Sequence, residues 1–91
     1  MQLQFQKNIQ FTKLIKADGR LREFNFRKMG GIQDGLFTLD VSDEKGNRLM
    51  LRLHKEDGIW KVMEPENVPL WILRNEKIFH DVIEEELASN P

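Results

Sequence analysis

Residues 36–63 read LFTLDVSDEKGNRLMLRLHKEDGIWKVM, and this stretch decides the fold. Apolar side chains occupy alternate positions over three strand-length runs, which is the pattern of a half-buried antiparallel sheet. These residues are Phe37, Leu39 and Val41, then Leu49, Leu51 and Leu53, then Trp60 and Val62. The stretch therefore predicts three consecutive antiparallel strands that share one apolar face.

Two glycine-containing turns set the register of these strands. The loop Glu44-Lys45-Gly46 fits a type I turn followed by a G1 bulge, in which the glycine takes the left-handed conformation. Asp57-Gly58 fits a two-residue hairpin turn. The predicted pairs are Val41 with Leu49, Leu39 with Leu51, Phe37 with Leu53, Leu53 with Val62 and Lys55 with Trp60.

A further hairpin is predicted within residues 9–28. Asp18-Gly19 suits a type I′ turn, because both residues tolerate positive φ. The predicted pairs are Ala17 with Arg20, Ile15 with Arg22, Lys13 with Phe24, Phe11 with Phe26 and Ile9 with Lys28. A slip of one residue would move Phe11 and Phe26 to opposite faces, so turn chemistry and apolar pattern agree. Residues 1–8 are expected to form a frayed arm or to pair with a neighbouring molecule, and residues 29–35 to form a glycine-rich loop.

One helix is predicted after the sheet, over residues 68–87. Two prolines in residues 64–69 end the strand pattern, and Asn67 is the expected N-cap. Ile72, Phe79 and Ile83 recur at helical spacing and define an apolar stripe. A single-layer sheet needs such a cover. The predicted fold is therefore α+β, with an antiparallel meander of about five strands and one C-terminal helix packed across one face.

Length and composition favour a single cytoplasmic domain over residues 1–91. The chain has 91 residues, is 40% hydrophobic and 32% charged, and contains no cysteine, which excludes a disulfide scaffold and a cysteine nucleophile. The N-terminal residues contain no apolar signal segment, and no run is long enough for a membrane span. Neither a membrane nor a cofactor is expected as a partner.

The net charge of −1 hides an asymmetry between sheet and helix. Residues 1–61 carry 12 Lys+Arg and 8 Asp+Glu, whereas residues 62–91 carry 2 and 7. The face of the sheet that the helix leaves open is expected to be basic. Its basic residues are Lys16, Arg27, Arg48, Arg52 and Lys61. Two interpretations stay open: a solvated face with cross-strand ion pairs to Glu23 and Asp40, or a surface for an anionic chain.

The predicted order of elements over residues 11–87 resembles the repeat of the PUR family and the Whirly proteins. The resemblance implies binding of single-stranded nucleic acid, but it rests on no shared motif and assigns no residue. Binding that tolerates any sequence uses aromatic stacking platforms. The predicted register places Phe11, Phe24, Phe26, Phe37 and Trp60 on the covered face, which counts against this function.

Three residues recur every fourth position on the predicted helix: Glu76, His80 and Glu84. Such a row can hold a metal ion, although it is also common on solvent-facing helices. Ser42 has no nucleophile motif around it, and His54 would reach it only diagonally. We therefore predict no catalytic, metal or cofactor site.

Leu70 and Leu73 fall off the apolar stripe of the predicted helix, and Trp71 lies between them. An apolar cluster beside a short sheet often marks a protein interface, and Trp is enriched at hot spots. The other interpretation packs Trp71 beneath the helix start. The sequence as a whole predicts a non-catalytic protein–protein interaction module that forms a homo-oligomer or binds a protein partner. The alternative is a single-stranded nucleic-acid binder that uses the basic open face.

Overall fold

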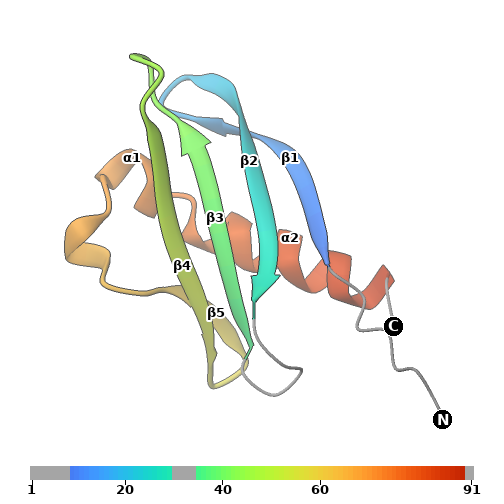
Figure 1. Ribbon diagram of the computed structural model, residues 1–91. Coiled ribbons are helices and arrows are strands. Elements are labelled where there is room, and N and C mark those ends of the chain that lie inside the picture. Colours follow the sequence, from blue (N-terminus) through green and yellow to red (C-terminus); the bar gives the residue numbers. More distant parts are fainter. Residues whose placement is uncertain (1–8, 30–34, 90–91) are drawn as a thin grey trace, which may run out of the picture.

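The computed structural model describes residues 9–29 and 35–89, and these form one antiparallel sheet followed by short and long helices. The strands are β1 (Gln10–Ala17), β2 (Arg20–Met29), β3 (Leu36–Ser42), β4 (Arg48–Glu56) and β5 (Ile59–Val62). Each strand pairs with its neighbours in sequence, in the order β1-β2-β3-β4-β5. Figure 1 shows the sheet curling around α2 (Glu76–Ser89), which crosses its far side. The predicted α+β meander is confirmed.

The turns set the strand register as predicted. Asp18 and Asp57 both have positive φ, of 55° and 52°, and each is followed by a glycine at φ 81°. Gly46 also has φ 81° and closes the bulged turn between β3 and β4, where its N–H donates to the Asp43 carbonyl. Every strand pair predicted within β1–β2, β3–β4 and β4–β5 is present. Ile9 and Lys28 are joined by a backbone hydrogen bond.

The core lies between the concave face of the sheet and the helices. Phe24, Phe37 and Phe79 are fully buried. The Phe79 ring of α2 lies 5.2 Å from the ring of Phe24, and the Phe37 ring meets Trp60 edge-on at 5.1 Å. The space between α2 and the sheet is therefore occupied by aromatic and aliphatic side chains, as in a close-packed interior.

The single helix predicted over residues 68–87 is wrong in its first third. The chain instead forms a 3₁₀ turn, η1 (Pro65–Asn67), then a one-turn helix, α1 (Leu70–Leu73), and then α2. Asn67 lies inside η1, and no side chain caps α1. The break falls at Asn75, whose side-chain amide donates to the Trp71 carbonyl. Asparagine disfavours helix interiors because it bonds to nearby backbone in this way.

Two further boundaries differ from the sequence expectation. Met29 belongs to β2 and pairs with Leu36, although it was predicted to begin a loop. The predicted arm at residues 1–8 and residues 30–34 of the loop lie outside the described residues. In the part of the chain that the structure describes, no helix has the length and apolar character to cross a bilayer.

Candidate interaction surfaces

The open face of the sheet is divided into two halves, and the first is tied together by polar side chains. The Thr12 hydroxyl donates to Asn25 Oδ1 at 2.6 Å, and Asn25 Nδ2 donates to Asp40 Oδ1 at 2.9 Å. Arg48 forms an ion pair with Asp40 at 3.7 Å. These four residues come from four adjacent strands, and we call them the tied half. Arg48 is thus engaged within the molecule.

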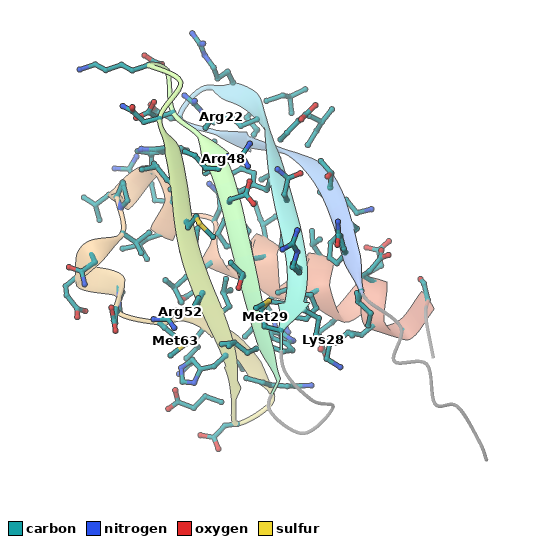
Figure 2. The ribbon with its side chains drawn as sticks, in the orientation of Figure 1. Arg22, Lys28, Met29, Arg48, Arg52 and Met63 are labelled. Carbon is teal, nitrogen blue, oxygen red and sulfur yellow. The ribbon has the colours of Figure 1, made fainter. Side chains whose placement is uncertain are left out.

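The second half of the open face carries three basic side chains with no such ties. Arg27, Arg52 and Lys61 are exposed, and within residues 9–29 and 35–89 none of them forms an ion pair or side-chain hydrogen bond. Met29 and Met63 lie beside them in the ladder. Figure 2 shows Arg52 and Met63 together near one end of the sheet, and Arg48 toward the other. We call these five residues the basic half.

Lys16, the fifth predicted basic residue, lies apart from the basic half. It is exposed and pairs with Leu21 at the β1–β2 turn. Leu14 and Leu21 are diagonal neighbours there and are 62% and 64% exposed. The structure therefore brings three of the five predicted basic residues together and surrounds Lys16 with exposed leucines instead.

The described open face carries no Phe, Tyr or Trp side chain, and its only ring is the imidazole of His54. Phe24, Phe26, Phe37 and Trp60 are buried in the core, and Phe11 stacks on Phe26 with ring centroids 4.7 Å apart. The stacking platforms that would support sequence-tolerant binding of single strands are therefore turned inward in this part of the chain.

The predicted interface residues do not form one exposed patch. Leu70 is 69% exposed, whereas Leu73 packs against the core. Trp71 is half-buried, packs against the same core, and holds the guanidinium of Arg22 4.7 Å from its ring centre. The interface itself stays a prediction, with Leu70 as its exposed part.

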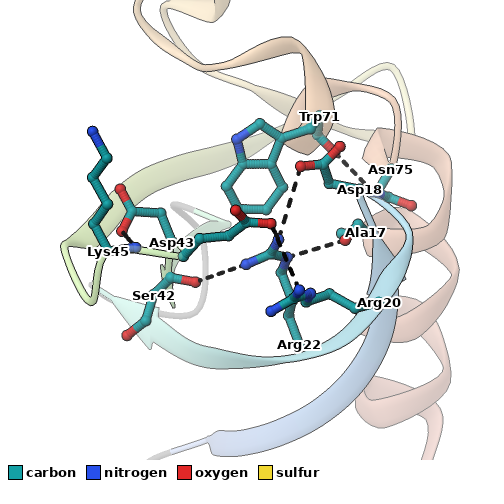
Figure 3. Close-up of polar contacts among 10 residues, drawn as sticks. Ala17, Asp18, Arg20, Arg22, Ser42, Asp43, Lys45, Trp71 and Asn75 are labelled. Atoms are coloured by element: carbon teal, nitrogen blue, oxygen red, sulfur yellow. Dashed lines mark hydrogen bonds and ion pairs between the residues drawn. The ribbon is translucent and has the colours of Figure 1, made fainter.

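Arg22 is a structural residue for which the sequence predicted a strand pairing but no role. Its side chain is 7% exposed and lies on the covered face. As Figure 3 shows, Nε donates to the Ala17 carbonyl at 3.0 Å, and Nη1 to the Ser42 carbonyl at 3.4 Å. Asp18 and Glu44 pair with Nη2 at 3.8 and 3.5 Å. Arg22 therefore joins two turns and Trp71 at one end of the core; the predicted Ile15–Arg22 pair was the signal that placed it there.

A shallow hollow of about 320 Å³ opens beside Arg22. Its lining includes Asp43, whose carboxylate accepts the backbone N–H groups of Lys45 and Asn47 at 2.9 and 2.8 Å. The bond from the Asn47 backbone is the largest cause that lowers the pKa of Asp43. The polar groups that line this hollow bond to one another. Their role is therefore to hold the turns together and to close one end of the core.

The row Glu76, His80 and Glu84 caps the outer edge of β5. Glu76 Oε2 accepts the Val62 backbone N–H at 2.8 Å, and His80 Nδ1 accepts the Trp60 backbone N–H at 3.1 Å. Glu84 Oε2 accepts the Trp60 indole N–H at 3.0 Å. Neither interpretation from the sequence, a metal row or a plain solvent-facing row, describes this role. The described residues include no group of three or more His, Cys, Asp or Glu side chains placed to hold a metal ion.

The environment of Glu84 favours its charged form. The bond from the Trp60 indole is the largest cause that lowers the pKa of Glu84, and Lys55 adds a contact at 3.4 Å. The carboxylate therefore joins α2, β4 and β5 through one oxygen.

The outer edge of β1 has no comparable cap among the described residues. Because the two-residue turn makes Ala17–Arg20 a hydrogen-bonded pair, the N–H and C=O groups of even-numbered β1 residues point away from β2. The outward residues are Gln10, Thr12, Leu14 and Lys16. Within residues 9–29 and 35–89, no group accepts a hydrogen bond from these N–H groups. An uncapped edge is a template for pairing with another strand.

The serine and histidine considered for catalysis lie far apart. Ser42 pairs with Arg48 at one end of β4, whereas His54 pairs with Leu36 near the other end. His54 Nε2 lies 3.6 Å from Glu56. The structure does not assemble a nucleophile and base from these residues.

Comparison with protein-family models, curated proteins and solved structures finds no match for this chain.

Proposed function

We propose that this chain is a non-catalytic protein–protein interaction module that self-associates, and that two copies meet along β1. The observation that carries the proposal is the contrast between the sheet edges. Side chains of α2 accept both outward N–H groups of β5 at Trp60 and Val62, whereas those of β1 are uncapped within the described residues. A strand from a second copy would satisfy the β1 row.

Apolar side chains beside the same edge support this proposal. Leu14 lies on β1 itself, and Leu21 is its diagonal neighbour on β2. Both are more than half exposed, so pairing along β1 would bury apolar surface in addition to forming backbone hydrogen bonds. The combination favours β1 over Leu70, which is exposed without an adjacent free edge.

The charges on β1 restrict the register of the pair. Lys13 would face its own copy if an antiparallel pair were centred on it, and like charges directly opposite each other destabilise a sheet. A pair centred on Leu14 places Lys13 opposite Ile15 of the second copy instead, and Thr12 opposite Lys16. Both strands then use their outward N–H and C=O groups, and two five-stranded sheets become continuous.

The nucleic-acid alternative has less support, because the described open face lacks Phe, Tyr and Trp side chains. The proposed compartment is the cytoplasm, and the cysteine-free sequence supports this proposal. Membranes and cofactors are not part of the proposal.

The test is the molecular mass in solution, by sedimentation or light scattering, as a function of protein concentration. Thr12→Pro removes an outward N–H without removing a β1–β2 hydrogen bond, so it should give a folded monomer. Thr12→Val also removes the hydroxyl group but keeps the N–H, and should remain a dimer. A wild-type chain that stays monomeric at the highest attainable concentration, or a Thr12→Pro variant that dimerises like Thr12→Val, would overturn the proposal.

A further inference from the structure

We propose that the basic half of the open face binds an acidic segment of a protein partner that also carries apolar side chains. This surface is distinct from the β1 edge and goes beyond self-association. It is defined by Arg27, Arg52, Lys61, Met29 and Met63 on strands β2, β4 and β5.

The strand register brings these side chains together. Arg27 pairs with Thr38, and Thr38 pairs with Arg52, so the three lie in one row across β2, β3 and β4. Two strand spacings separate the arginines by about 10 Å at the backbone. Met63 follows in the row, since its N–H donates to the Arg52 carbonyl at 2.8 Å. The next row along the strands begins at Met29, which pairs with Leu36. His54 pairs with both Leu36 and Lys61, so the row ends at Lys61, the third cation.

The positive charge of the basic half is not neutralised by the described part of the chain. In the tied half, Asp40 pairs with Arg48. Asp40 is also a diagonal neighbour of Arg27 and Arg52 in the ladder, but its ion pair is with Arg48. Glu56 is a diagonal neighbour of Lys61, but its carboxylate lies 3.6 Å from His54. Three exposed cationic side chains lie near one another on a chain whose net charge is −1. They create a local positive field that attracts an anionic partner.

The chemistry between the cations favours a protein segment over a nucleic-acid strand. Met29 is 41% exposed, and Met63 is half-buried beside Arg52. Flexible, polarisable methionine side chains adapt to the apolar residues of protein partners. Stacked bases would favour the large rings of Phe, Tyr or Trp, and the described open face presents none of these. Carboxylates would meet the three cations, and apolar side chains would meet the methionines.

The experiment measures fluorescence anisotropy of three labelled probes against the full chain at low and moderate salt. The first probe is a short peptide of Glu and Leu, the second replaces each Glu with Gln, and the third is single-stranded oligo-dT. Each titration is repeated with the Thr12→Pro variant. Because that variant lacks the proposed dimer contact, binding to it separates this inference from the proposal of self-association.

The matched pair of variants is Arg52→Glu and Arg48→Glu. Both reverse one arginine on the same face of β4, but Arg48 belongs to the tied half. We expect the Glu-Leu peptide to bind the wild-type chain, and the Gln-Leu peptide to bind it at least about tenfold more weakly. Arg52→Glu should weaken binding of the Glu-Leu peptide by about tenfold, which corresponds to 1.4 kcal/mol. Arg48→Glu should weaken binding less than Arg52→Glu does, because Arg48 lies outside the basic half and salt screens the interaction of more distant charges.

Three results would overturn the inference. One is tighter binding of oligo-dT than of the acidic peptide with the same sensitivity to Arg52→Glu, which would make the surface a nucleic-acid site. Another is equal weakening by Arg48→Glu, which would place the site elsewhere on the face. The last is the absence of binding of the acidic peptide to the wild-type chain at low salt. An unchanged melting temperature of Arg52→Glu shows that weakened binding by this variant is not caused by unfolding.

Discussion

The two edge strands of the sheet, β5 and β1, differ in the partners of their outward backbone N–H groups. At β5, Glu76 and His80 of α2 accept the outward backbone N–H groups, and Glu84 accepts the indole N–H of the same strand. At β1, the outward groups of even-numbered residues meet no such acceptor in the described part of the chain. One edge is therefore closed by the protein itself, and the other is available for another strand.

The difference follows from where the helix lies. The α2 helix makes its closest element contacts with β5, and its residues at every fourth position face that strand's outer edge. β1 lies at the opposite end of the sheet order from β5, and no described side chain of α2 accepts its outward N–H groups. Among the described residues, the one-helix cover therefore caps one edge of the five-stranded meander and leaves the other uncapped.

The largest effect should come from proline at an inward position of β1. Lys13 pairs with Phe24 and directs its N–H toward β2, so Lys13→Pro removes a ladder hydrogen bond and leaves the carbonyl of a fully buried residue unpaired. We expect a loss of about 3 kcal/mol in the free energy of unfolding. Denaturant titration should show a much smaller loss for Thr12→Pro. Equal losses for the two prolines would mean that the assignment of inward and outward groups is wrong.

Removal of a cap from β5 should have the next largest effect. Glu76→Ala leaves the backbone N–H of buried Val62 without its acceptor and should cost about 1–3 kcal/mol. Thermal or denaturant unfolding measures the loss. Glu85→Ala is the control, because Glu85 is an exposed carboxylate on the same helix. Glu76→Gln keeps an acceptor oxygen and should lose less than Glu76→Ala. If Glu76→Ala and Glu85→Ala behave alike, the cap contributes nothing to stability.

The strand register could be predicted from the sequence because two independent signals agree. Asp18-Gly19, the bulged turn at Gly46 and Asp57-Gly58 each fix a loop length, and the apolar alternation accepts only the register that these loops give. The same register already placed Arg22 opposite Ile15 on the covered face. Its partners could not be predicted, because Trp71 and Glu44 reach it from segments whose distance depends on tertiary packing.

The caps of β5 could not be predicted for a different reason. A row of Glu and His at every fourth position has the same pattern on a helix that faces solvent, a metal or a strand edge. Only the placement of α2 against β5 separates these cases. The break between α1 and α2 was missed because the apolar stripe continues through it, from Ile72 to Phe79, while Asn75 bonds locally to the Trp71 carbonyl.

The contribution of Glu84 to the stability of the folded chain should depend on pH. Because the pKa of Glu84 is lowered in the folded chain, chiefly by the Trp60 indole, its contribution is present at neutral pH and is lost as pH falls through the lowered pKa. Glu84→Gln should therefore be less stable than the wild type above the ordinary glutamate pKa of about 4.3, and the difference should shrink in stronger acid. The side chain is 40% exposed, so we expect less than about 1 kcal/mol. A difference that grows in acid would contradict this sign.

The smallest effect on the folded monomer should come from Leu14→Ser at the open edge. Leu14 is 62% exposed, so the substitution removes little buried apolar surface, and we expect a change within about 0.5 kcal/mol. The measurement belongs in the Thr12→Pro background, because dimerisation would otherwise add to the apparent stability of the parent chain. In the dimerising chain, the same substitution should raise the concentration needed for association. A large loss in the monomer would mean that Leu14 supports the fold itself, and the β1 edge would then resemble the β5 edge in being used within the molecule.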